Sequence, residues 1–226
     1  MRAIPADPSH SEDSDVKERK LVRSPAVSHW WLLIAWPLYF LSYFLTEALI
    51  PVRRCTPIHC KLDDLIPFCE FFVIPYVFWY FLIAGSLLYF ARHHVKSFRK
   101  LMTFFIVTMI CANIIFVLFP SRQDLRPAII PRDNVFSKIV GFLYTFDTNT
   151  NVFPSLHVAF SIGIAYVWLS EKTFPLPIRL FVLISSILIC FSTAFIKQHS
   201  VLDGIAAIPI SVAAGFFSSL QLKFAG

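Results

Sequence analysis

Near the C-terminal end of the chain, two residues have the spacing of a histidine–carboxylate pair. In the stretch FIKQHSVLD, His199 and Asp203 are four residues apart, so at the start of a helix they lie on one side of it, with Cβ atoms about 5–6 Å apart. A carboxylate placed there accepts the Nδ1 proton and leaves the Nε2 lone pair directed elsewhere, as a histidine nucleophile or a metal ligand requires. The alternative is an interfacial histidine and a solvated aspartate that share this spacing by chance.

A second histidine stands at the start of another apolar segment. In NVFPSLHVAF, His157 follows Pro154 and Ser155, which favour the start of a helix. A helix N-terminus presents free backbone N–H groups and a positive dipole end, which suit a phosphate, so Ser155 is a candidate phosphate-binding residue. Three cations occur in segments that the predicted spans bring to the same face: Arg122, Arg126 and Lys197. Two histidines, an orienting acid, three cations and a helix N-terminus are the parts of a phosphoryl-transfer site.

The composition indicates that membrane-spanning helices hold these residues. Of the 226 residues, 57% are hydrophobic, 16% are aromatic and only 15% are charged, which exceeds the apolar content of ordinary soluble domains. A spanning helix needs about 20 mostly apolar residues. We therefore predict an all-α fold, a polytopic six-transmembrane-helix bundle, with spans at about 30–50, 68–91, 101–119, 155–170, 176–196 and 200–222, the fourth being short.

Charges near the span ends predict the orientation of the bundle. Residues 1–28 are polar and predict a disordered cytoplasmic tail, and residues 29–226 form one membrane domain. Lys and Arg in this tail and in the segment 92–100 favour the cytoplasmic side. Six crossings then place both termini in the cytoplasm. The stretches FPSRQDLRP, FPSLH and FIKQHSVLD meet on the outer face, where the active site is expected.

Between the third and fourth spans, residues 134–146 read NVFSKIVGFLYTF, with apolar residues largely on one side. This pattern predicts a short helix in the membrane interface. Such a helix either lines a lateral entrance for a lipid or only covers the gap between the two spans.

Other polar residues are expected to have structural roles. Four acids lie near span ends on the site face, where a charge must be hydrated or paired, and we expect them to cap helices or face water: Glu47, Asp63, Asp64 and Glu70. Cys55 and Cys60 are close enough in sequence for a small disulfide if that face is oxidising. The net charge of +6 fits membrane topology and anionic headgroups, and no feature indicates nucleic acid.

Three ordered motifs make the chain resemble the phosphatidic acid phosphatase type 2 superfamily, membrane enzymes related in site design to vanadium haloperoxidases. That family carries a Lys, six residues and Arg-Pro; then Pro-Ser-Gly-His; then Ser-Arg, five residues, His, three residues and Asp. The counterparts here are Arg126-Pro127, then Pro154-Ser155-Leu156-His157, then Ser192-Thr193 with His199 and Asp203. The resemblance covers all six spans, from about residue 30 to the C-terminus.

The resemblance implies a lipid phosphatase that hydrolyses a phosphatidate- or prenyl-diphosphate-type lipid. His199 would attack phosphorus to form a phosphohistidine, Asp203 would hold its imidazolium, and His157 would protonate the leaving oxygen. Water or an alcohol would then release the phosphate. This scheme needs no cofactor and no metal, and the sequence offers no compact carboxylate or cysteine cluster that suggests a metal site.

The chain departs from the family pattern at three positions. Phe119 stands at the motif Lys, Thr193 at the motif Arg, and Leu156 at the motif Gly. Arg122 and Lys197 are the residues that could replace the missing charge. The Pro-Ser-Leu-His form and the absent Lys are also similar to the branch containing inositol phosphorylceramide synthases, which transfer a phospho-headgroup to a lipid alcohol. Hydrolase and transferase thus remain alternatives.

A second class of function is a non-catalytic binder or transporter that uses a cationic pocket for an anionic headgroup. The two missing motif cations favour it. Against it, a binder has no use for His199 with Asp203 four residues on and His157 opposite. A lipid phosphate substrate in the bilayer is the partner that both interpretations share.

Overall fold

The structure is a computed structural model that describes residues 29–224. The chain divides into two units, residues 1–31 and 32–226, and the described residues of the first only open a 3-10 helix, His29–Ile34. The second unit is mostly helical, with eight α-helices among the described residues. The tail predicted for residues 1–28 lies outside the described residues.

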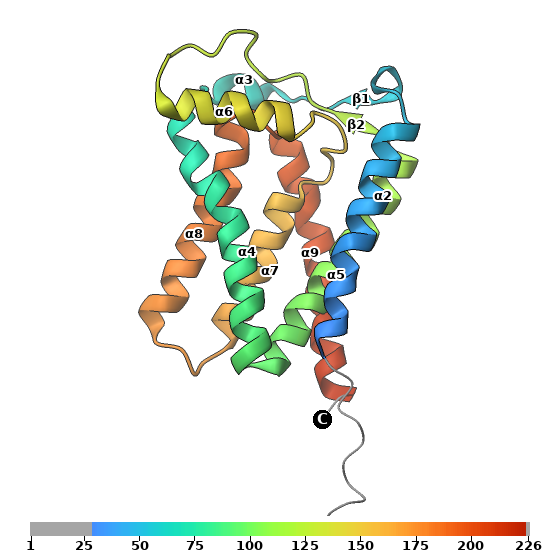
Figure 1. Cartoon of the computed structure of the whole chain (residues 1–226), viewed down its shortest axis with the longest axis vertical. Helices are drawn as coiled ribbons and strands as arrows, with labels where there is room; N and C mark the ends of the chain where they lie inside the picture. The colour runs from blue at the N-terminus through green and yellow to red at the C-terminus, as the bar shows by residue number, and fades with distance from the viewer. Residues whose placement is uncertain (1–28, 225–226) are drawn as a thin grey trace, which may run out of the picture. The chain divides into compact units, whose positions relative to one another are not determined.

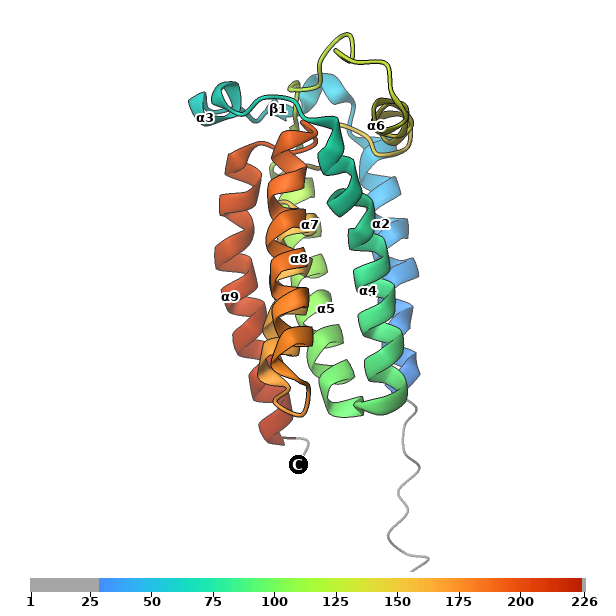
Figure 2. The same ribbon diagram turned by 90° about the vertical axis from the view of Figure 1, so that its left-hand side faces the viewer.

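Five helices in the described part of the chain are long and apolar enough to cross a membrane. They are α2 (Ala35–Leu49, which continues the 3-10 helix), α4 (Val73–His93), α5 (Val95–Leu118), α8 (Leu176–Phe195) and α9 (Val201–Phe224). Figures 1 and 2 show them running side by side, with α7 (Leu156–Ser170) among them. The five lie where the first, second, third, fifth and sixth spans are predicted.

The shorter helix α7 is the centre of the bundle. It packs against α5, α8 and α9, and against α4. Its 15 residues extend about 22 Å at 1.5 Å per residue, less than the roughly 30 Å hydrocarbon core of a bilayer. Nine of them are buried, including Ala159, Phe160 and Ile164. The other helices therefore cover most of α7, so little of this short helix is exposed at the surface of the bundle.

Gly163 lets α5 and α7 approach closely. A Cβ atom at this position would lie 2.5 Å from two ring atoms of Phe104 on α5, and that ring is fully buried. We expect Gly163→Ala to lower the free energy of unfolding by about 1–3 kcal/mol, because the ring must move within a packed core. The melting temperature of the purified protein in detergent measures this effect.

Gly85 in α4 is the matched control, since a Cβ atom there meets nothing within 4 Å. Gly85→Ala should leave the melting temperature unchanged or raise it, because alanine favours a helix over glycine by about 1 kcal/mol. If the two variants melt at the same temperature, the inference that α5 and α7 pack too closely at Gly163 to admit a Cβ atom is wrong.

One end of the bundle carries the short elements (Figure 1). These are α3 (Lys61–Leu65), α6 (Val135–Phe146), the strands β1 (Thr56–Pro57) and β2 (Ser121–Arg122), and 3-10 helices at Val52–Arg54 and Glu70–Phe72. The two strands pair in parallel, with Thr56 opposite Ser121. The all-α prediction does not include this pair. Its backbone bonds join the loops after α2 and α5, and no apolar alternation marks so short a pairing in sequence.

A buried acid fastens the loop before α6 to the start of α4. Glu70, whose side chain is fully buried, accepts hydrogen bonds from Arg132 Nε at 2.6 Å and Asn134 Nδ2 at 2.9 Å. Asn134 also caps α6, because its Oδ1 accepts from the Ser137 N–H at 2.9 Å. The expectation that Glu70 caps a helix or faces water is therefore wrong, since a buried carboxylate needs a cation and donors around it.

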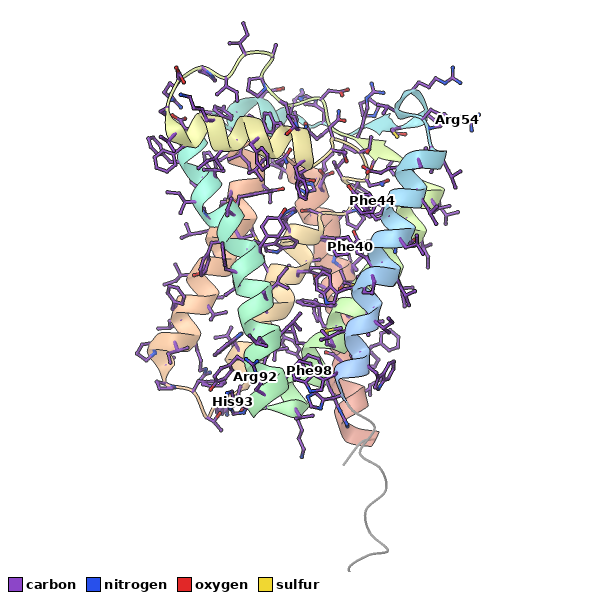
Figure 3. The ribbon with its side chains drawn as sticks, viewed as in Figure 1. Phe40, Phe44, Arg54, Arg92, His93 and Phe98 are labelled. Atoms are coloured by element: carbon purple, nitrogen blue, oxygen red, sulfur yellow. The ribbon has the colours of Figure 1, made fainter. Side chains whose placement is uncertain are left out.

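The opposite end of the bundle holds the basic residues predicted for a cytoplasmic loop. In Figure 3, Arg92 and His93 lie at this end, and Arg54 lies at the other. The connection is shorter than expected, because only His94 separates α4 from α5. Lys96, Arg99 and Lys100 therefore belong to the first turns of α5 and extend that helix beyond the predicted apolar span.

Candidate active site

His199 and Asp203 are held together at the start of α9. His199 Nδ1 lies 3.2 Å from Asp203 Oδ2, and the Asp203 side chain is fully buried. The same oxygen accepts the Ser200 N–H at 2.9 Å. After α8, the N–H groups of Gln198 and His199 both donate to the carbonyl of Thr193, at 2.9 and 3.1 Å. This tight turn places the imidazole before the helix that carries its carboxylate partner.

His157 lies opposite His199, in the first turn of α7. Ser155 caps this helix, because its Oγ accepts the Val158 N–H. The His157 ring stacks on Tyr76 and Trp79 with centroid distances of 4.5 and 4.1 Å, and its centroid is 5.5 Å from that of His199. Its Nε2 is buried and has no partner among the described residues. Aromatic rings of α4 therefore pack against this imidazole, and its Nε2 is left without a partner among the described residues.

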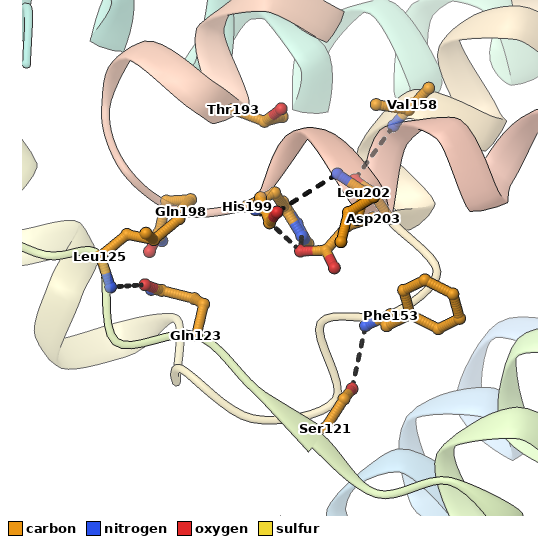
Figure 4. Close-up of polar contacts among 12 residues, drawn as sticks. Ser121, Gln123, Leu125, Phe153, Val158, Thr193, Gln198, His199, Leu202 and Asp203 are labelled. Atoms are coloured by element: carbon orange, nitrogen blue, oxygen red, sulfur yellow. Dashed lines mark hydrogen bonds and ion pairs between the residues drawn. The ribbon is translucent and has the colours of Figure 1, made fainter. Parts of the chain in front are cut away.

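The three predicted site segments meet at this point. The Ser155 N–H donates to the Asp203 carbonyl at 3.0 Å, which joins the starts of α7 and α9. The Phe153 N–H donates to Ser121 Oγ at 3.0 Å, which joins the loop before α7 to the loop after α5. Figure 4 shows the contact between Phe153 and Ser121, with Gln198 beside His199 and Gln123 on the adjoining loop.

Arg126, the residue matching the first motif, is surrounded by protein acceptors. Its Nε and Nη2 donate to Gln198 Oε1 at 3.0 and 2.6 Å. Its Nη1 donates to the Tyr144 carbonyl, and its Nη2 also donates to the carbonyls of Asp147 and Thr148. Desolvation lowers the pKa of this guanidinium, although Asp147 opposes the shift. Arg126 thus ties α6 and the loop after it to the residue preceding His199.

Lys197 does not point toward the histidines. Its Nζ donates to the carbonyls of Asp63 and Ile66, at 2.7 and 2.5 Å, and burial lowers its pKa. Its backbone has a positive φ of 57°, a conformation that turns the chain sharply after α8. The side chain is directed to the loop around α3, so in this structure it fastens that loop instead of presenting a charge to the site.

Arg122 also has its partners elsewhere. Its Nε lies 3.0 Å from Asp124, and its Nη1 donates to the carbonyls of Val52 and Cys55. Arg122 thus donates to the loop between α2 and α3, whereas Lys197 donates to α3 and to the residue that follows it, and no motif predicts either set of acceptors.

A cavity of about 330 Å³ opens beside the two histidines. It is lined by α2, α4, the end of α5, the segment from Phe146 to Val152, the start of α7, and Gln198 with His199. The wall is mainly aromatic, and Figure 3 labels Phe40 and Phe44 of α2, which belong to it. Among the described residues that line it there is no lysine or arginine. The cavity thus suits apolar chains more than a multiply charged anion.

Two carboxylates on the cavity wall were not predicted as site residues. Glu47 Oε1 accepts hydrogen bonds from Thr150 Oγ1 at 2.8 Å and from Thr148 Oγ1. Asp147 Oδ2 accepts from Gln198 Nε2 at 3.1 Å and from the Tyr76 hydroxyl. The sequence did contain a signal for Glu47, because it is an acid in the last turn of an apolar span. A charge at such a position usually has a partner or a function. Asp147 had no signal, because its position depends on α6.

Asp63 holds the turn that carries His199. It is 2% exposed, and its carboxylate accepts from Ser200 Oγ at 2.6 Å, the Val201 N–H at 2.8 Å and the Cys60 N–H at 2.8 Å. Burial raises its pKa, but these hydrogen bonds outweigh that effect and leave the pKa below its usual value. Asp63 was expected to cap a helix or face water. It does cap α3, and it also caps α9, which was not expected.

Cys55 and Cys60, in the segment between α2 and α3, are free thiols in this structure. The Cys55 Sγ donates to the Pro51 carbonyl at 3.9 Å. Cys60 is the residue before α3, and its Sγ takes part in the capping box with Asp63. The disulfide considered from their spacing is therefore not formed.

Comparison with known proteins gives one match. Residues 62–217 match the family model described as the PAP2 superfamily. No curated protein and no solved structure matches the chain. The matched stretch begins at α3, ends within α9, and contains Arg126, His157, His199 and Asp203.

Proposed function

Because the chain belongs to the PAP2 superfamily, whose general activity is phosphatase-type hydrolysis, we propose that it transfers a phosphoryl group from a lipid through a phosphohistidine at His199. The observation that carries the proposal is the pairing of His199 Nδ1 with Asp203 at 3.2 Å, beside a second imidazole whose Nε2 has no partner among the described residues. Both histidines line an aromatic cavity that can accommodate acyl or prenyl chains.

The reaction has two steps. His199 Nε2 forms a bond to phosphorus as the bond to the leaving oxygen breaks, and His157 Nε2 donates a proton to that oxygen. Asp203 remains ionised and holds the Nδ1 proton, which offsets the imidazolium charge. In the second step water or an alcohol gives a proton to His157 while its oxygen bonds to phosphorus. The phosphorus–nitrogen bond then breaks and both histidines return to their starting states.

The phosphate oxygens are proposed to lie at the start of α7. The N–H groups of Leu156 and His157 have no acceptor among the described residues, and Ser155 sets their direction by capping the helix. Asn151 Nδ2 is buried nearby and is likewise unpaired within the described part of the chain. These neutral donors replace part of the missing cationic charge. Arg126 acts indirectly in this scheme, by positioning Gln198 next to His199.

The membrane arrangement is proposed to have six crossings, with α7 as the fourth, both termini in the cytoplasm and the site on the outer face. The supporting observation is that Arg92, Lys96, Arg99 and Lys100 lie at the end of the bundle opposite the site, where Figure 3 labels Arg92. For α6 we propose an interfacial position, because Val135, Ile139, Phe142 and Phe146 form an exposed apolar stripe along it. Phe146 also lines the cavity, which favours lateral entry of a lipid beside this helix.

Transfer to a lipid alcohol is the second candidate, and the cavity wall favours it. A phosphate monoester carries close to two negative charges at neutral pH, and the wall presents Glu47 and Asp147 and no lysine or arginine among the described residues. A phosphodiester carries one charge and fits this wall better. The binder interpretation requires a cationic pocket, and no lysine or arginine lines this cavity among the described residues.

A lipid panel with labelled phosphate tests the proposal. Purified protein in detergent, without added metal, is given phosphatidate, a prenyl diphosphate and phosphodiester lipids, with and without a lipid alcohol. We expect the label to appear in free phosphate or phospho-headgroup for a hydrolase and in a new lipid for a transferase, and orthovanadate to inhibit as a phosphate mimic. Absence of turnover across the panel would leave lipid binding as the function.

A further inference from the structure

Resting on this proposed function, we propose that Glu47 and Asp147 form a subsite for a positively charged headgroup, so that the preferred lipid is a zwitterionic phosphodiester whose amino alcohol carries an ammonium. The two carboxylates belong to the cavity wall that His157 and His199 also line. Glu47 bonds to Thr148, the residue after Asp147, so both acids face the same end of the cavity. Asp147 also accepts a hydrogen bond from Gln198, the residue before His199, which joins this part of the cavity to the histidines.

Each carboxylate is held by one oxygen and keeps the other available. Glu47 Oε1 takes the hydroxyls of Thr148 and Thr150, whereas its Oε2 accepts no hydrogen bond from the described residues. Asp147 Oδ2 takes Tyr76 and Gln198, and its Oδ1 is similarly unused within the described part of the chain. Neither acid has an ion-pair partner among the described residues. These donors hold one oxygen of each carboxylate in place, and the other oxygen of each has no hydrogen-bond donor among the described residues.

Aromatic rings surround this acidic end. Tyr39, Tyr43 and Phe44 of α2 line the cavity next to Glu47, and Tyr80 lines it from α4. The rings of Tyr39 and Tyr43 lie 6.0 Å apart, and the Tyr43 hydroxyl is 3.3 Å from Thr148 Oγ1, within the network that holds Glu47. Ring faces attract a cation through their quadrupole, an attraction that a neutral polyol does not receive. Aromatic rings together with unpaired carboxylates thus favour an ammonium over an array of hydroxyls.

Unpaired donors on the same wall indicate where the negative part of the ligand lies. Trp79 Nε1 and Asn151 Nδ2 belong to side chains that are each 8% exposed and line the cavity, and neither atom has a partner within the described residues. The Trp79 ring packs against His157 with their centroids 4.1 Å apart, so this side chain lies beside the histidines. Buried donors without acceptors are costly unless a ligand satisfies them. The lining residues of the cavity therefore include hydrogen-bond donors without acceptors as well as the carboxylates of Glu47 and Asp147, and a zwitterion needs both kinds of group.

Binding to a catalytically silent protein tests the subsite separately from turnover. The His199→Ala protein, in a non-ionic detergent, is titrated with short-chain phosphatidylcholine and with phosphatidylglycerol of the same acyl chains, and tryptophan fluorescence is followed because Trp36 and Trp79 line the cavity. We expect tighter binding of the choline lipid. Adding Glu47→Gln, which keeps the shape and the contacts to Thr148 and Thr150, should weaken choline-lipid binding about 10-fold or more and leave phosphatidylglycerol binding nearly unchanged.

Asp133→Asn is the matched control, since this carboxylate is 87% exposed, pairs with Lys138 and does not line the cavity. It should change neither affinity. Equal affinity for the two lipids, or choline-lipid binding that is insensitive to Glu47→Gln, would overturn the subsite. If wild-type protein binds the choline lipid preferentially but turns over no lipid, the subsite stands and the proposed phosphoryl transfer is wrong. Melting temperatures of all variants show that each is folded.

Discussion

Replacing His199 by alanine is expected to slow phosphate release by about 1,000-fold or more, because the proposed mechanism has no other nucleophile for its first step. The fold should remain, since Asp203 keeps the hydrogen bond from the Ser200 N–H and its carbonyl keeps the bond from the Ser155 N–H. Initial rates at saturating lipid, together with the melting temperature, measure the two effects separately. A rapid acid-free quench should also trap labelled protein in the wild type and no label in the variant.

His93→Ala is the control of the same chemical kind. His93 is exposed at the opposite end of the bundle (Figure 3), at the end of α4. Its removal should change the rate by less than about 2-fold, in the range of surface substitutions. A His199→Ala protein that retains a tenth of the wild-type rate would exclude His199 as the nucleophile. The covalent label in that protein would then identify the residue that attacks.

Replacing Asp63 by alanine is expected to lower both stability and activity, although Asp63 touches no substrate in the proposed site. Its carboxylate binds Ser200 Oγ and the Val201 N–H, at 2.6 and 2.8 Å, and so holds the turn in front of α9. We expect a loss of about 2–4 kcal/mol, because buried donors lose a charged acceptor. The rate should fall as well, through a displaced His199–Asp203 pair. Asp63→Asn should recover part of the stability if the contact is positional.

Asp64→Ala is the adjacent control, since Asp64 is exposed and its ion-pair partner among the described residues is His59, at 2.8 Å. A pair of this kind contributes about 0–1 kcal/mol. The pH dependence separates the two residues further. Because the folded-state pKa of Asp63 lies below its ordinary value of 3.8, its stabilisation is complete above that value and is lost as the pH falls through the folded-state pKa. Melting temperatures are compared between about pH 5 and 7, where the Asp63 carboxylate is ionised. Equal values for the two alanine variants in this range would contradict the role of Asp63.

Most of the helix positions could be predicted from sequence, because a long apolar run has few other solutions. Backbone groups in a low-dielectric layer must bond within their own segment, so a run such as 176–196 predicts a helix without knowledge of its neighbours. The structure has α8 at Leu176–Phe195. The pairing of His199 with Asp203 was predictable for the same reason, since a four-residue spacing on one helix is local geometry. The family resemblance carried by these motifs is confirmed by the match over residues 62–217.

The directions of the cations could not be predicted in this way. Lys197 stands two residues from His199 in sequence, and yet it bonds to carbonyls of Asp63 and Ile66, more than 130 residues away. In the same way, Arg122 donates a hydrogen bond to the carbonyl of Val52, in the loop after α2. A flexible, charged side chain goes to whichever acceptors lie within its reach, and those acceptors come from elements that neighbouring sequence does not specify.

The amino-acid sequence alone determined the helical character, the order of the motifs and the identities of the histidine pair, because each depends on composition or on spacing within one segment. Tertiary structure alone decided which acids face the cavity. Asp63 and Asp64 are neighbours with the same side chain, and packing of α3 against the start of α9 buries the first and leaves the second exposed. Glu47 and Asp147 meet at one cavity although 100 positions separate them, since burial and contact are properties of the assembled bundle.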